Sequence, residues 1–242
     1  MNIKTLLTTL NSISPFELQD SWDNSGLIVG ELSQEVGKIY LSLDIEAGML
    51  DAVEDGSVLV VHHPLIFKGL KRVDFAVYPS NILKKAIKKD IAIIAMHTNF
   101  DQTHLNRYVL EEVLGYEMTE CEGYLAYFHV GKPFGEFALE VADKLGLDLV
   151  RVVQGCDFVE SAALCTGAGA SLLGELRADC LLTGDIKYHE ALAAKEEGKG
   201  IIDIGHYESE RYFAVCMQKL LETKGLNGII ANSKNPFSYI KG

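Results

Sequence analysis

The sequence predicts an α/β fold made of two similar α/β halves with mixed sheets. Short apolar runs of strand length alternate with segments of helical periodicity, which is the pattern of α/β proteins. The alternation restarts near residue 120, so we place one half at residues 1–123 and the other at 124–242. The last helix can still pack on the first half. No Pro- or Gly-rich linker separates the halves, so we expect them to pack tightly together rather than to be joined by a flexible tether.

In the first half, strands are expected where the chain is β-rich or almost continuously apolar, as at 57–61. Helices are expected where apolar residues recur every three or four positions, as at 81–89. Gly115 ends the last helix of this half. The predicted strands are 38–43, 57–61 and 91–96, and the predicted helices are 46–54, 81–89 and 101–114.

The second half follows the same rules. Pro133 suits the first turn of a helix that continues through Leu145, and Gly146 ends it. The remaining helices are predicted at 171–176, 187–197 and 208–224. The predicted strands are 124–130, 149–153, 162–165, 180–182, 200–204 and 228–231.

Composition excludes several classes of protein. Of the 242 residues 48% are hydrophobic, which is a folded composition, and the net charge is −12. That charge makes nucleic-acid binding unexpected, because a nucleic-acid coat needs a basic face. An anionic substrate is not excluded, since bound cations can reverse the charge locally. No stretch has the roughly 18 apolar residues of a membrane span, and the N-terminal residues lack the pattern of a signal peptide.

The five cysteines are scattered and have no C-x-x-C spacing. They predict reduced, mostly buried thiols and a cytoplasmic protein, with neither a disulfide framework nor a zinc knuckle.

Five of the seven histidines fall in four short clusters at strand ends or helix starts. His62 and His63 directly follow the strand at 57–61, where ligands bind in open α/β sheets. Neighbouring residues of an extended chain point in opposite directions, so two adjacent metals could take one imidazole each. The alternative is a hydrogen-bonded pair in a turn.

His97 and Asp101 follow the strand at 91–96. Asp101 is either the N-cap of the next helix or a carboxylate ligand. His97 is a candidate metal ligand, acid/base or orienting residue.

His206 and Glu210 stand four residues apart, so on a helix they share one face. An ordinary acidic first turn explains them equally. Asp185 and His189 form a weaker cluster, in which His189 is expected one helical turn after Asp185 and on the same face. Asp185 can be only a cap, and a lone helix histidine is usually structural.

Together, His62, His63, Asp101, His206 and Glu210 are five donors without a cysteine. Such a set suits two metal ions better than one structural zinc, and it predicts a metal-dependent hydrolase. Zn, Mn and Fe fit the donors about equally. The turn at 167–171 could hold a phosphate or be only a tight turn. Lys68, Lys71 and Arg72 could meet an anion or form a solvated loop.

These clusters, in this order, resemble the NGG-interacting-factor-three-like family, whose bacterial members are often labelled GTP cyclohydrolase I type 2 homologues. The resemblance extends over essentially the whole chain. The chain is similar to the short form of the family, because no segment is long enough for the extra central domain of longer members. Its motifs are 22–30, which we interpret as a structural turn before a strand, and those around His62–His63, 97–101, 167–171, 183–189 and 205–210.

The resemblance implies two α/β halves around an interdomain metal cleft and a ring-like homohexamer. His62 and His206 would hold one metal, His63 and Asp101 the other, and Glu210 would be shared. The family label implies that GTP and water give 7,8-dihydroneopterin triphosphate and formate. A hydroxide would attack C8 of guanine, and His97 or His189 could move protons. The alternatives are a hydrolase or phosphoesterase of another small substrate, or a non-catalytic metal-binding ring.

Overall fold

The structure is a computed structural model that describes residues 1–231, 233–238 and 240. The chain folds into two compact units. The first comprises Met1–Phe100 and the described residues from Phe213 onward, and the second is Asp101–Tyr212. This division differs from the predicted one at 123/124. The chain leaves the first unit within a helical stretch, where no loop or change of composition marks the crossing, and its last helix returns to that unit.

The first unit contains a five-stranded mixed sheet with the order β1-β4-β3-β2-β11. Strand β1 runs antiparallel to β4, and the other neighbours are parallel. The strands predicted at 38–43, 57–61, 91–96 and 228–231 are therefore present, whereas β1 was not predicted. The strands are β1 (Gly26–Val29), β2 (Ile39–Ser42), β3 (Val58–Val61), β4 (Ala92–Ala95) and β11 (Gly228–Ile230).

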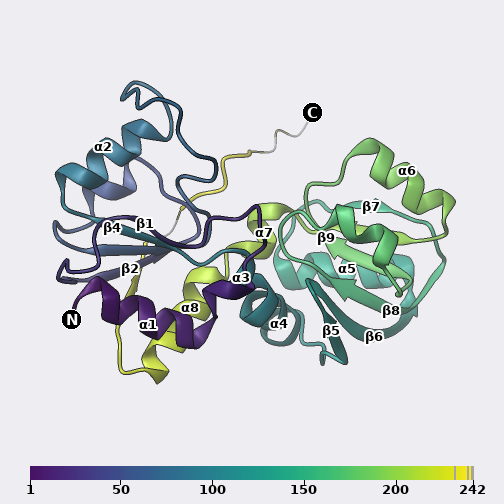
Figure 1. Cartoon of the computed structure of the whole chain (residues 1–242). Coiled ribbons are helices and arrows are strands. Elements are labelled where there is room, and N and C mark those ends of the chain that lie inside the picture. Colours follow the sequence, from purple (N-terminus) through teal and green to yellow (C-terminus); the bar gives the residue numbers. More distant parts are fainter. Residues whose placement is uncertain (232, 239, 241–242) are drawn as a thin grey trace. The chain divides into compact units, whose positions relative to one another are not determined.

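Helices cover both faces of this sheet, with α2 on one face and α1 and α8 on the other (Figure 1). Burial on both faces explains why β2, β3 and β4 are fully buried and nearly continuously apolar. The helical elements of this unit are α1 (Ile3–Ile13), η1 (Phe16–Leu18), η2 (Met49–Asp51), α2 (Ser80–Lys88), α3 (Thr98–Phe100) and α8 (Phe213–Thr223).

Two helix predictions are wrong in extent. The segment at 46–54 forms only the 3₁₀ turn η2, whose preceding residue is Gly48, a poor helix former. The helix expected at 208–224 is two helices, α7 (His206–Glu210) and α8. The chain passes from the second unit to the first between Tyr212 and Phe213, and the periodicity of the side chains does not reveal this break.

The second unit contains a six-stranded mixed sheet with the order β5-β6-β8-β9-β10-β7. Strands β8, β9 and β10 are parallel, and the outer pairings are antiparallel. With the first sheet, this confirms an α/β fold with two mixed sheets. The strands are β5 (Glu120–Glu122), β6 (Leu125–Pro133), β7 (Arg151–Val153), β8 (Phe158–Leu164), β9 (Cys180–Thr183) and β10 (Gly200–Asp203).

Helix α5 packs on one face of the second sheet, where Phe137 contacts Phe128 of β6 with ring centroids 6.2 Å apart. Buried residues of η5 and α6 join the cluster on the other face, around Ile201 of β10. The stretch predicted as one helix at 101–114 alternates π and α turns. The helical elements are η3 (Asp101–Leu105), α4 (Asn106–Tyr108), η4 (Val109–Val113), α5 (Phe134–Leu145), η5 (Ala170–Glu175), α6 (Tyr188–Glu196) and α7.

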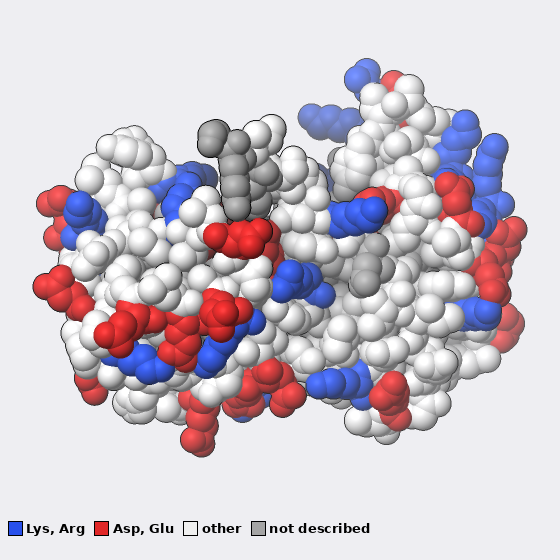
Figure 2. Space-filling model, turned by 180° about the vertical axis from the view of Figure 1, so that it is seen from behind, with Lys and Arg blue, Asp and Glu red and all other residues white. Residues whose placement is uncertain are grey.

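The charged side chains do not separate by sign. Acidic and basic residues are interspersed over the face drawn in Figure 2, and no broad basic area forms there among the residues described. Among the same residues, no helix combines the length and the apolar character needed to cross a bilayer.

The carboxylate of Glu140 on α5 is expected to stabilise the fold in a pH-dependent way. Burial would raise the pKa of this carboxyl, but hydrogen bonds from Lys132, Lys144 and Tyr116 outweigh it and lower the pKa to about 2. Its stabilisation is therefore fully present above the unfolded pKa near 4.5 and is lost as the pH falls through the folded pKa. We expect Glu140→Gln to lower the unfolding free energy by about 1 kcal/mol at pH 7.

Thermal unfolding of both proteins at pH 7 and pH 3 checks this prediction. The difference in Tm should be about 2–4 °C at pH 7 and should shrink at pH 3. A difference that is the same at both pH values would show that the ionised carboxylate is not what stabilises the fold.

Candidate metal centre

Three histidines meet at one edge of the first sheet. His62 and His63 directly follow β3, and His97 follows its parallel neighbour β4 by one residue, so both strands deliver them to the same edge. One potential ligand atom from each ring lies within 4.8 Å of the others. The ring centroid of His62 lies 5.0 Å from that of His63 and 5.0 Å from that of His97, and the centroids of His63 and His97 are 5.5 Å apart. The close packing makes this edge a candidate metal site.

Each of these rings is oriented through its Nδ1 atom. Nδ1 of His63 lies 2.8 Å from Oδ1 of Asp44, and Nδ1 of His97 lies 2.7 Å from Oδ1 of Asp23. Nδ1 of the buried His62 lies 2.9 Å from the carbonyl oxygen of Met96. A carboxylate or carbonyl behind Nδ1 fixes the tautomer, so Nε2 is the ring nitrogen suited to coordinate a metal.

Asp23 is held as a carboxylate by several donors. Its Oδ2 atom accepts from the hydroxyl of Thr98 at 2.5 Å and from the Thr98 backbone N–H at 3.1 Å. Burial would raise the pKa of Asp23, but the hydrogen bonds from His97 and Thr98 and the charge of His97 hold the pKa far below its ordinary value. Asp23 is therefore a charged residue that positions His97.

Asp23 and Asp44 were not among the predicted site residues. Asp44 could have been found, since it follows β2, which runs parallel to β3 and ends at the same edge of the sheet. Asp23 precedes the antiparallel strand β1, so the strand-end rule does not find it. The segment 22–30, which we interpreted only as a structural turn, thus supplies the partner of His97 as well as β1.

In the second unit, α7 brings His206 and Glu210 together as their spacing predicted. Nε2 of His206 lies 3.0 Å from Oε2 of Glu210. Asp101 and Glu210 are both buried, and a carboxylate oxygen of one lies within 4.8 Å of one from the other. Asp101 opens the π-helical η3, and its Oδ1 accepts from the hydroxyl of Thr166 at 3.4 Å. The fold therefore gathers two carboxylates and one imidazole.

His206 is oriented as the other histidines are. Its Nδ1 lies 2.8 Å from Oδ2 of Asp185, a residue with φ of 58° in the turn before α6. Burial would lower the pKa of His206, but hydrogen bonds and charge from Glu210 and Asp185 raise it to about 9. The site therefore favours a positive charge beside Glu210, whether on the imidazole or on a metal that replaces its proton.

The Gly-rich turn approaches Glu210 closely. Gly167 has φ of 68°, and a Cβ there would lie 2.2 Å from Oε1 of Glu210. The N–H of Gly167 donates to Oγ of Ser209, and the N–H of Gly169 donates to Oγ1 of Thr183. Because these N–H groups already have protein partners, the structure favours the tight-turn interpretation over the phosphate site.

His189 lies apart from this donor set. It is exposed on α6, and its ring contacts Tyr188 at a centroid distance of 5.3 Å. Asp185 precedes α6, so the expectation that Asp185 and His189 share one helix face is wrong.

The whole chain matches one known family. The sequence profile of Duf34/NIF3 (NGG1p interacting factor 3) matches residues 1–236. The chain belongs to this family.

A Campylobacter jejuni protein named GTP cyclohydrolase 1 type 2 homolog is 42% identical, with 99% of this chain and all of that protein covered. A Helicobacter pylori protein named GTP cyclohydrolase 1 type 2 is 38% identical, with 98% and 99% covered. A hypothetical protein from Staphylococcus aureus has the same fold, with a TM-score of 0.86, 28% identity and 99% of both chains covered.

Proposed function

We propose that this chain is a metal-dependent hydrolase that converts GTP and water to 7,8-dihydroneopterin triphosphate and formate. The proposed ligands of two divalent metal ions, Zn, Mn or Fe, are His62, His63, Asp101, His206 and Glu210, paired as the family resemblance implies. The observation that supports a metal centre best is that the Nδ1 atom of every proposed histidine ligand lies within hydrogen-bond distance of a carboxylate or carbonyl oxygen.

The donor chemistry fits such ions. Imidazole nitrogens and carboxylate oxygens are ordinary ligands of Zn, Mn and Fe. The buried carboxylates of Asp101 and Glu210 repel each other, and a cation between buried carboxylates removes this cost. When bound, divalent metals would lower the pKa of water to near neutrality and stabilise developing negative charge on oxygen.

The proposed substrate is GTP because relatives aligned along almost their whole length carry the GTP cyclohydrolase name. The reaction adds water to C8 of guanine and opens the imidazole ring, and a second hydrolysis releases C8 as formate. Rearrangement of the ribose and closure of the new ring then release one water, so that one water is consumed overall. We propose that His97 moves a proton at Nε2, because its Nδ1 lies 2.7 Å from Oδ1 of Asp23 and leaves Nε2 as the nitrogen available for transfer. A similar role for the exposed His189 stays a prediction. We expect the protein to assemble as a homohexamer.

GTP labelled with ¹³C at C8 tests this reaction. Metal-loaded protein should release the label as formate, together with a fluorescent pterin after oxidation. A parallel panel of phosphate mono- and diesters tests the phosphoesterase alternative. Release of phosphate without labelled formate would replace the cyclohydrolase with a phosphoesterase, and no product from any compound would remove the catalytic proposal.

A further inference from the structure

Two exposed aromatic side chains lie against the ring of His97. Trp22 is 57% exposed and Phe67 is 42% exposed. Their ring centroids are 5.8 Å apart, and they lie 6.3 Å and 6.1 Å from the ring centroid of His97. The planes of Trp22 and Phe67 meet at 56°, so the two rings form an open corner. A flat ligand that stacks on one ring would touch the edge of the other.

Hydrogen bonds of the neighbouring residues hold this corner in place. The side-chain amide of Asn24 donates to the carbonyl oxygen of Ile66 at 2.5 Å, which joins the segment of Trp22 to the residue before Phe67. Asp23, between Trp22 and Asn24, orients His97. Three consecutive residues, Trp22 to Asn24, therefore connect the aromatic corner to His97.

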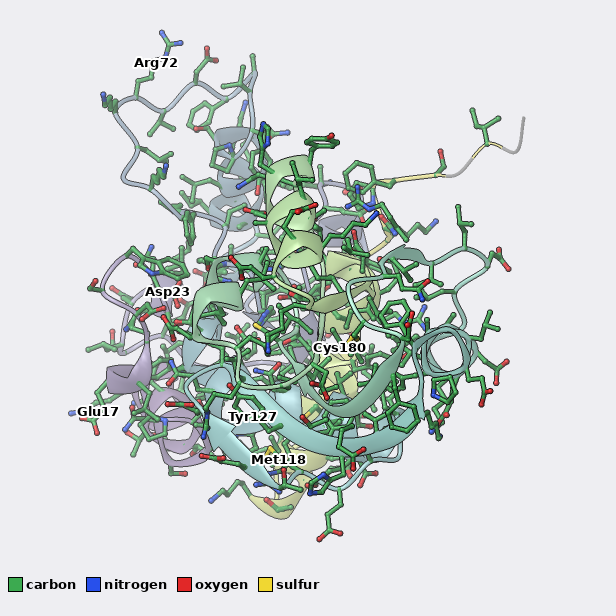
Figure 3. All side chains as sticks on the ribbon, turned by 90° about the vertical axis from the view of Figure 1, so that its right-hand side faces the viewer. Glu17, Asp23, Arg72, Met118, Tyr127 and Cys180 are labelled. Atoms are coloured by element: carbon green, nitrogen blue, oxygen red, sulfur yellow. The ribbon has the colours of Figure 1, made fainter. Side chains whose placement is uncertain are left out.

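A cationic loop leaves the corner directly. Lys68, Lys71 and Arg72 are all exposed, and none of them forms an ion pair with another described residue. Figure 3 shows Arg72 far out on this loop. The acid within the same stretch, Asp74, accepts a hydrogen bond from the backbone of Ala76. In a chain with a net charge of −12, this loop is a local positive feature beside an aromatic one.

We infer that Trp22 and Phe67 are the base-binding corner of a purine nucleotide site, and that Lys68, Lys71 and Arg72 meet its phosphates. Purine rings stack on aromatic side chains, and phosphates attract Lys and Arg. Trp, Phe and Arg are also common in protein interfaces, but lysine is depleted there, so the two lysines favour a phosphate ligand over a protein partner. This inference rests on the proposed function, since it supplies the nucleotide recognition that the metal ligands do not.

Trp22 is the only tryptophan of the chain, so its fluorescence reports on this corner alone. We would titrate the full chain, metal-loaded and metal-stripped, with GTP, guanosine, UTP and inorganic tripolyphosphate. GTP and guanosine should quench Trp22 saturably, UTP should quench less, and tripolyphosphate should compete with GTP without quenching. Binding of GTP by equilibrium dialysis without any change in Trp22 emission would overturn the inference. A Trp22 emission that depends on protein concentration would assign the corner to a second copy instead.

Variants separate stacking from general damage to the surface. Trp22→Ala should weaken GTP binding, measured by dialysis, by about tenfold, whereas Trp22→Phe should retain most of it. Phe158→Ala is the matched control, since Phe158 is 51% exposed at the start of β8 in the other unit. Equal losses in Trp22→Ala and Phe158→Ala would contradict a base site at Trp22.

The readouts also distinguish this inference from the proposed reaction. If GTP quenches Trp22 but releases no formate, the base site stands and the cyclohydrolase proposal fails. If formate is released at the same rate and KM by Trp22→Ala, the base site fails and the reaction stands.

Discussion

His63→Ala is expected to abolish formate release from GTP, with a fall in turnover on the order of 10³-fold or more. His63 follows β3, and Asp44 orients it through Nδ1. Loss of a proposed ligand should also lower the metal bound per chain, which elemental analysis after gel filtration measures. The side chain is only partly buried, so the Tm of the metal-stripped protein should change little.

His129→Ala is the matched control, because His129 is exposed on β6 in the other unit. It should keep both the bound metal and the turnover of the wild type. If His63→Ala kept its full metal content and turnover, His63 would have no role as a ligand.

Gly167→Ala is expected to displace Glu210, one of the proposed metal ligands. A Cβ at this position would lie 2.2 Å from Oε1 of Glu210, and φ of 68° is unfavourable for alanine. Either Glu210 moves or the turn shifts. We expect a loss of about 1–3 kcal/mol in unfolding free energy and at least about tenfold weaker metal binding.

Gly174→Ala controls for the loss of a glycine in the same region. A Cβ at Gly174 would have no heavy atom within 4 Å, and the residue is exposed in η5. Its unfolding free energy should stay within about 0.5 kcal/mol of the wild type, as measured by urea denaturation. If Gly167→Ala behaved like Gly174→Ala in both stability and metal binding, the close approach to Glu210 would have no consequence.

The strands were predictable where they are buried on both faces. The sequences of β3 and β4 are short apolar runs, and they are too short to be helices. Strand β1 was missed because it is only partly buried. Helix α1 was not predicted, although Ile3, Leu6 and Leu10 have helical spacing and are buried.

The donor residues were predictable because they follow strand ends or share a helix face. His62 and His63 follow β3, and His206 and Glu210 span one turn of α7. The partners behind them were not predictable, because they come from distant positions. Asp23 and His97 are separated by 74 positions in the sequence, and Asp185 and His206 by 21 positions. Such contacts depend on the tertiary fold rather than on local spacing.

Metal titration of stripped protein tests the central claim most directly. The rate of formate release from GTP would be followed as Zn, Mn or Fe is added in known equivalents. We expect no turnover without metal and a maximum rate close to two equivalents per chain with at least one of these ions. Formate release that is undiminished in fully stripped protein, or that reaches its maximum at one equivalent, would contradict a hydrolase with two metal ions.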